Sequence, residues 1–214
     1  DILYTKVVAI YGIPKIVNTD EEFSIFVSLA LLKPDKTKII PRFLEIAVQA
    51  RLKGLKMGCS SNAYFTSEAL QDLIPLLDFI NVGMKGFSDK AYQACGMTSI
   101  TPVLRNLETL HAAGVHVEIS CILTSENQSE LTALARYIAS ISRNIPLQVM
   151  RFLPFETAAI AQEPSIHDAE NFCRSLRRHL DYVYLFNTPG SDHLHTCCPR
   201  CGRVVLRRKF YGPM

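Results

Sequence analysis

Lys85 and the pair Ser61 and Asn62 each follow an apolar, strand-like segment, and their side chains carry groups that bind anions or polar ligands. Lys85 comes directly before Gly86, which places an ammonium group beside a flexible turn. A cation there suits a carboxylate or phosphate ligand, although a solvated loop lysine has the same pattern. Ser61 and Asn62 offer a hydroxyl and an amide, and simple turn chemistry explains them equally well.

Arg151 and Glu118 are charged residues within or at the end of segments that are otherwise apolar. An unpaired guanidinium would be costly in such a segment, so we expect an anionic partner for Arg151, either a ligand or an internal carboxylate. Glu118 is the obvious internal candidate, and it could equally accept a hydrogen bond from a ligand hydroxyl. Both residues are therefore candidate ligand-binding groups.

The run Cys-Cys-Pro-Arg-Cys-Gly at 197–202 contains the Cys-Pro-x-Cys-Gly form of a zinc knuckle, with Cys198 and Cys201 as the metal ligands. One knuckle supplies two of the four ligands of tetrahedral zinc. Cys197, His193 or His195 could add others. The sequence leaves two interpretations open, half of a zinc site whose partner is missing from this chain and a turn without metal.

Helices and strands alternate along the chain in units of about 30 residues. The expected helices cover 41–53, 66–77, 101–113, 127–141 and 165–180, and the expected strands cover 55–60, 79–84, 115–123, 147–152 and 182–186. Asn127 with Glu130, and Ser165 with Asp168, form capping-box patterns at two helix starts. This alternation predicts parallel strands with right-handed crossovers, hence an α/β barrel or part of one, with an open doubly wound sheet as the alternative.

Composition places the chain among ordinary globular proteins, because 214 residues with 48% hydrophobic and 20% charged residues can bury one sizeable core. A net charge of +3 is too small to predict a nucleic-acid partner, and no apolar stretch is long enough to span a membrane. Seven cysteines form an odd set that suits a reducing compartment, so we expect a cytoplasmic protein. The chain begins with Asp rather than Met, which suggests that an upstream segment was removed or not included.

Three stretches have a familiar order, GLKMGCSSNAYFTSEALQDLIPLLDFINVGMKGFSDKAY from residue 54, TPVLRNLETLHAAGVHVEISCIL from residue 101 and IPLQVMRFLPF from residue 145. They resemble radical S-adenosylmethionine enzymes, and among these they are most similar to the pyruvate formate-lyase activating enzymes and their Memo-associated relatives. The tail, with YLFNTPG followed by CCPRCGRVVLRR, looks like the end of the same branch.

The resemblance implies a partial (β/α)6 TIM-like barrel, which we place at residues 41–190. The strands before it, at 1–40, are poorly placed, and the small cysteine knuckle follows it at 191–214. The resemblance also implies S-adenosylmethionine and a [4Fe-4S] cluster as cofactors, production of a 5′-deoxyadenosyl radical, and an electron donor such as flavodoxin or ferredoxin. Ser61 and Asn62 match the loop beside the methionine end of the cofactor. Lys85 matches the lysine of an Asp-Leu-Lys motif that holds its carboxylate. The substrate, a protein or a small molecule, is not implied.

Several positions depart from the family pattern. The cluster loop Cys-x3-Cys-x2-Cys, whose thiolates bind three of the four irons, does not occur in this sequence. Gly83 replaces the motif aspartate, and Ala63 replaces the glycine that usually follows Asn62. Gln148 and Leu153 stand where two histidines are expected. Two explanations remain open, an incomplete record of a longer enzyme and a degenerate, non-catalytic barrel that acts as a ligand-binding or assembly scaffold.

Overall fold

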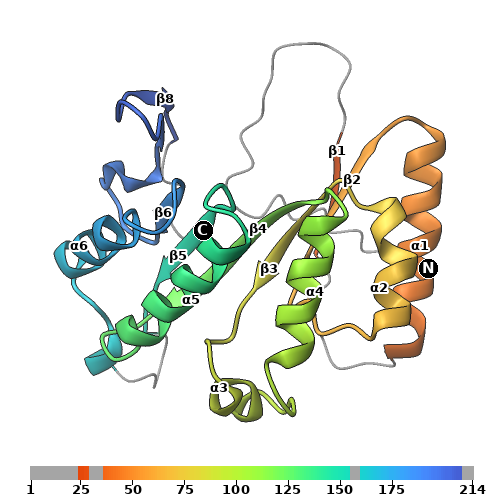
Figure 1. Ribbon diagram of the computed structural model, residues 1–214, viewed down its shortest axis with the longest axis horizontal. Coiled ribbons are helices and arrows are strands. Elements are labelled where there is room, and N and C mark those ends of the chain that lie inside the picture. The colour runs from red at the N-terminus through yellow and green to blue at the C-terminus, as the bar shows by residue number, and fades with distance from the viewer. Residues whose placement is uncertain (1–23, 29–35, 155–159, 209–214) are drawn as a thin grey trace. The chain divides into compact units, whose positions relative to one another are not determined.

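The computed structural model of the chain describes residues 24–28, 36–154 and 160–208, with side chains described from residue 44 onward (Figure 1). The chain divides into two compact units. The first unit comprises Asp1–Val82 with Pro102–Val117, and the second unit comprises Gly83–Thr101 with Glu118–Met214. Of the segment 1–40 in which strands were expected, the structure describes only residues 24–28 and 36–40. The domain boundaries expected near 40 and 190 stay predictions.

The first unit is built on parallel strands with helices between them. β1 (Ser24–Ser28) pairs with β2 (Lys56–Ser61), and β2 pairs with β3 (Phe79–Gly83), both in parallel. Its helical segments are α1 (Lys36–Leu52), α2 (Ser67–Leu73), the 3-10 turn η1 (Ile74–Leu76) and α4 (Thr101–Ala112). Thr66 caps α2 as expected, because its hydroxyl accepts a hydrogen bond from the Ala69 amide at 3.3 Å. β4 begins in this unit, where the His116 amide donates to the Asp78 carbonyl at 2.9 Å.

The second unit continues the parallel pattern and ends in a hairpin. β4 (His116–Leu123), β5 (Leu147–Arg151) and β6 (Val183–Phe186) pair in parallel in that order. Its helical segments are α3 (Asp89–Ala94), α5 (Gln128–Ile141), η2 (Ile160–Gln162), α6 (Ile166–Leu176) and η3 (Asp192–Leu194). β7 (Thr196–Cys197) and β8 (Val204–Leu206) form an antiparallel hairpin, which lies near β6 in Figure 1.

The strands of the second unit have one buried face and one partly exposed face. Ile119, Cys121 and Leu123 of β4 are buried, as are Leu147 and Val149 of β5 and Val183 and Leu185 of β6. The alternate residues form what we call the open face, which consists of Glu118, Ser120, Ile122, Gln148, Met150, Tyr184 and Phe186. Gln148 and Phe186 are buried on this face, and the others are partly or largely exposed. This alternation follows from the two-residue period of a strand, and it leaves polar groups on the open face.

The α/β class and the parallel strands predicted from the sequence are confirmed. The Ser165–Asp168 pattern also begins a helix, with the Asp168 amide donating to the Ser165 hydroxyl at 3.0 Å. Helix α3 was missed by the sequence analysis, although Ser88 caps it through the Ala91 amide at 3.3 Å. No helix among the described residues is both long and apolar enough to cross a bilayer.

Candidate functional site

The loop after β2 uses the side chains of Ser61 and Asn62 to form a turn. The Ser61 hydroxyl accepts a hydrogen bond from the Ala63 amide at 3.1 Å, and the Asn62 Oδ1 accepts one from the Tyr64 amide at 3.2 Å. Ser61 is buried at the end of β2, and Asn62 is partly exposed. The sequence left turn chemistry and ligand binding open for this pair, and these contacts show that at least the turn role is filled.

Ala63 occupies a backbone conformation that favours glycine, with φ at 52°, and its side chain is fully buried. The buried Asn106 of α4 holds this conformation, because its Nδ2 donates to the Ala63 carbonyl at 2.8 Å and to the Phe65 carbonyl at 2.9 Å. The sequence analysis missed Asn106. Its signal was a lone amide at a helix position where the apolar pattern of α4 calls for a core residue.

Lys85 lies in the second unit, two residues after the end of β3, and its side chain is exposed. It forms no ion pair with any residue that the structure describes. The chain turns directly after it at Gly86, which has a φ of 150° and whose missing Cβ would lie only 2.6 Å from Ala91 Cβ. A side chain at Gly86 would therefore force this loop to move.

Glu130 anchors the loop that follows Lys85. Its Oε1 accepts hydrogen bonds from the Phe87 amide at 2.7 Å and from the Ser88 hydroxyl at 2.8 Å. The predicted capping box between Asn127 and Glu130 is therefore wrong. Asn127 makes no side-chain cap bond, because its Oδ1 accepts from the Thr124 amide at 2.9 Å. The carboxylate that a capping box would direct back to its own helix start instead fixes a distant loop.

Glu118 and Gln148 meet on the open face of the second unit. The Gln148 amide Nε2 donates a hydrogen bond to Glu118 Oε2. Gln148 is one of the two positions where the family resemblance leads us to expect histidine. Since a neutral amide takes that place here, the contact with Glu118 is a fixed hydrogen bond that does not depend on protonation of the partner.

Arg151 forms an ion pair with Glu163 inside the protein, so the prediction of Glu118 as its partner was wrong. The guanidinium, only 8% exposed, donates to the Glu163 carboxylate, to the Pro164 carbonyl at 3.1 Å and to the Asn187 carbonyl at 3.0 Å. Glu118 was expected to fill this role, but it lies on the opposite face of the strands. A strand places successive side chains on alternate faces, and the register of β4 with β5 pairs Ser120 with Gln148 and Leu123 with Arg151. Glu118 therefore shares a face with Gln148, and Arg151 shares the other face with Leu123.

Cys198 and Cys201 lie in the turn of the β7–β8 hairpin. The Cys198 amide donates to the Arg203 carbonyl and the Gly202 amide to the Cys198 carbonyl, each at 2.8 Å, and Gly202 has a φ of 70°. Hydrogen bonds from the backbone amides of Cys201 and Arg200, and then from the Cys201 side chain, lower the pKa of the partly exposed Cys198 thiol. By contrast, burial raises the pKa of Cys59 to about 12. The described residues contain no group of three or more His, Cys, Asp or Glu side chains suited to a metal ion.

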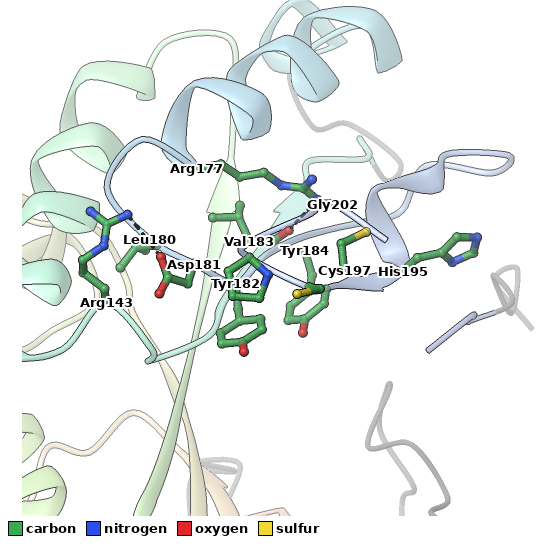
Figure 2. A pocket seen from close by; sticks show the side chains of 12 residues that line it. Arg143, Arg177, Leu180, Asp181, Tyr182, Val183, Tyr184, His195, Cys197 and Gly202 are labelled. Carbon is green, nitrogen blue, oxygen red and sulfur yellow. Dashed lines mark hydrogen bonds and ion pairs between the residues drawn. The ribbon is translucent and has the colours of Figure 1, made fainter. Parts of the chain in front are cut away.

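A cavity of about 220 Å³ lies in the second unit beside this hairpin, bordered by Tyr182, Tyr184 and Cys197 (Figure 2). Its arginines are already engaged. Arg143 forms an ion pair with Asp181 at 3.1 Å, and Arg177 donates to the Val183 carbonyl at 3.3 Å. The cavity therefore presents little uncommitted charge to an anionic ligand.

No protein-family model matches the chain. An uncharacterized protein of Methanocaldococcus jannaschii is 26% identical over 175 residues, a match that covers 78% of this chain and 51% of the relative. The chain thus spans about half the length of the curated relative that it matches.

Solved structures with similar folds are more informative. A domain of pyruvate-formate lyase-activating enzyme from Bacteroides vulgatus matches with a TM-score of 0.58 and 14% identity, covering 72% of this chain and 96% of that chain. Streptococcus suis SuiB bound to S-adenosylmethionine matches with a TM-score of 0.52 and 8% identity, and the match covers 69% of this chain and 35% of SuiB. The chain has a radical S-adenosylmethionine-like fold. This finding supports the fold implied by the sequence resemblance, while the Memo-associated branch and the cysteine knuckle stay predictions.

Proposed function

We propose that this chain is the S-adenosylmethionine-binding part of a radical S-adenosylmethionine-type protein that resembles glycyl-radical-enzyme activases. The observation that carries the proposal is Lys85, an exposed ammonium group at the carboxyl end of β3 that has no ion-pair partner among the described residues. Ligands of parallel α/β folds bind at the carboxyl ends of the strands. The similarity to SuiB bound to S-adenosylmethionine supports the choice of ligand.

The residues present suit the organic cofactor better than the cluster. Lys85 can bind the carboxylate of S-adenosylmethionine, and Glu118 of the same unit can accept a hydrogen bond from a hydroxyl. The role that the family resemblance implies for Ser61 and Asn62 stays a prediction. Arg151 is dropped as a ligand because Glu163 and two carbonyls already occupy it.

The [4Fe-4S] cluster does not fit the described residues, since they contain no set of three potential ligands, and the whole sequence lacks the three-cysteine motif. In a complete protein, the cluster would supply the electron that cleaves the cofactor and so produces a 5′-deoxyadenosyl radical. The part that we propose for this chain is binding and orienting the cofactor. We propose as well that the active protein would receive its electron from a donor such as flavodoxin or ferredoxin and would act on a protein or a small molecule.

Calorimetric titration with S-adenosylmethionine tests the role of Lys85. We expect Lys85→Ala to weaken binding to the full-length protein and to change the free energy of unfolding by less than about 0.5 kcal/mol, as for other exposed sites. Lys90→Ala is the matched control, because Lys90 is also exposed and lies in the neighbouring α3. Equal affinities for the Lys85 variant and the wild type, or a large loss of thermal stability, would show that the assignment is wrong.

A non-catalytic scaffold is the second candidate function, and the hydrogen bond between Gln148 and Glu118 favours it. A position expected to carry histidine is used here for an internal contact. Anaerobic reconstitution of the full-length protein with iron and sulfide separates the two candidates. About four irons per chain together with cofactor cleavage would establish the enzyme, whereas cofactor binding without iron would establish the scaffold.

A further inference from the structure

A second cavity of the second unit, with a volume of about 250 Å³, shares Arg177 with the cavity of Figure 2. Its walls come from the end of α6, from η3 and from the β7–β8 hairpin with the residue that follows it. They include the side chains of Arg177, His193 and Arg207. The proposed function uses none of these three, and guanidinium groups together with an imidazole are donors that suit an anion.

The wall of this cavity has a net positive charge. Neither Arg177 nor Arg207 forms an ion pair with any described carboxylate. Arg177 donates one hydrogen bond to the Val183 carbonyl, which lines the first cavity, and its guanidinium has five N–H donors in all. Asp192 also lines the second cavity, but its side chain is 95% exposed and lies 3.4 Å from His195 Nε2. Two guanidinium groups therefore stand against one well-solvated carboxylate.

His193 provides an independent observation. Its Nδ1 is one of two buried side-chain polar atoms that have no hydrogen-bond partner among the described residues. A buried nitrogen without a partner is costly, and an oxygen of a bound anion would supply the missing partner. Burial, and then the charge of Arg177, lower the pKa of His193 below its ordinary value. The ring is therefore neutral at pH 7, and with its proton on Nδ1 it donates one hydrogen bond.

Arg208 fixes the backbone around these groups. Its Nη1 donates to the Leu194 carbonyl at 3.0 Å, and its backbone amide donates to His195 Nδ1 at 3.2 Å. These contacts join the residue after Arg207 to the two residues after His193. The two side chains are therefore carried by segments that are already held together, so binding a ligand between them requires little further ordering of the backbone.

We propose that Arg177, Arg207 and His193 bind a phosphate group. A phosphate group carries a charge of about −1.5 to −2 at pH 7 and three strong acceptor oxygens, which suits two guanidinium groups and one imidazole donor. A carboxylate has one charge and two oxygens, so it would leave part of this donor set unused. The cavity, at about 250 Å³, is smaller than the roughly 300 Å³ of the smallest typical ligand pockets. It therefore takes the phosphate group itself, either free or as the end of a small ester.

Calorimetric titration of the full-length protein with inorganic phosphate, at constant ionic strength and without S-adenosylmethionine, tests the proposal. We expect saturable binding that Arg207→Gln weakens by about tenfold or more, because the variant removes hydrogen bonds to a charged group. Arg203→Gln is the matched control. Arg203 is an exposed arginine of the same hairpin that lines neither cavity, so its loss should change the affinity by less than about twofold. Circular dichroism checks that both variants are folded.

Nuclear magnetic resonance of the histidine ring nitrogens provides a second measurement. Phosphate should shift the Nδ1 signal of His193, which is identified by its loss in His193→Gln. Titration with ribose 5-phosphate distinguishes the two sources of the phosphate group, because tighter binding than that of inorganic phosphate indicates an ester and weaker binding indicates the free ion. The proposal is wrong if folded wild-type protein shows no saturable phosphate binding, if the His193 signal does not move, or if acetate binds as tightly as phosphate. Equal losses of affinity in the Arg207 and Arg203 variants would also overturn it.

Discussion

Asn106 offers the sharpest test of how the loop after β2 is held. Its side chain is fully buried, and its Nδ2 donates to the Ala63 and Phe65 carbonyls. In Asn106→Ala the Phe65 carbonyl keeps a donor, because Arg105 Nη2 lies 3.2 Å from it. The Ala63 carbonyl has no other hydrogen bond among the described residues and loses its partner.

The expected loss of stability has two parts. An unsatisfied buried carbonyl costs about 1–3 kcal/mol, and the space left by the deleted amide adds about 1 kcal/mol. The free energy of unfolding should therefore fall by about 2–4 kcal/mol, which corresponds to roughly 4–16 °C in Tm for a chain of this size. Urea unfolding followed by circular dichroism measures the first quantity, and calorimetry measures the second.

Asn144→Ala is the control, since Asn144 is also an asparagine but is exposed. Its cost should stay below about 0.5 kcal/mol. The reasoning fails if Asn106→Ala unfolds within about 0.5 kcal/mol of the wild type, or if the Asn144 variant is destabilised as much.

Three further results are expected. Gly86→Ala should lower the free energy of unfolding by about 1–3 kcal/mol, because the new Cβ would lie 2.6 Å from Ala91 Cβ; an unchanged Tm would contradict the tight packing of this loop. Arg151→Met should cost about 2–4 kcal/mol in urea unfolding, because it leaves a carboxylate and two carbonyls without their donor. Cys59, whose pKa burial raises to about 12, should resist iodoacetamide from pH 7 to 9 in the native chain, because its thiolate forms only as the pH approaches that value. The exposed Cys95 should be labelled throughout, as peptide mass spectrometry would show, and early labelling of Cys59 would indicate local opening.

The parallel α/β arrangement could be predicted because it depends on local patterns. Thr66 and Ser165 cap helices from within their own turns, and apolar periodicity marks each strand and helix. Glu130 shows where local reasoning failed. Its sequence neighbours predicted a cap, whereas its carboxylate accepts hydrogen bonds from a distant loop.

The candidate site was harder to predict, because its contacts join residues far apart in the chain. Glu118 was predicted as the partner of Arg151 because both charged residues lie in otherwise apolar segments. The face of the strand decides the pairing instead, and the observed partner, Glu163, lies in a segment with no recognisable pattern. Asn106 looked like one more polar helix residue until its two backbone acceptors were located. Lys85 could be placed at a strand end from the sequence, and its role there stays a prediction.

The anchor at Glu130 has a consequence for the order in which the chain acquires its structure. The amide of Phe87 and the carboxylate that binds it are 43 residues apart in sequence. Closing so long a loop costs entropy before the hydrogen bonds can form. The segment that carries Lys85 should therefore become ordered only after α5 has been made and packed. During synthesis from the N-terminus, a nascent chain that has not yet reached Glu130 would contain all of β3 but would lack the contacts that set the direction of the loop beyond it.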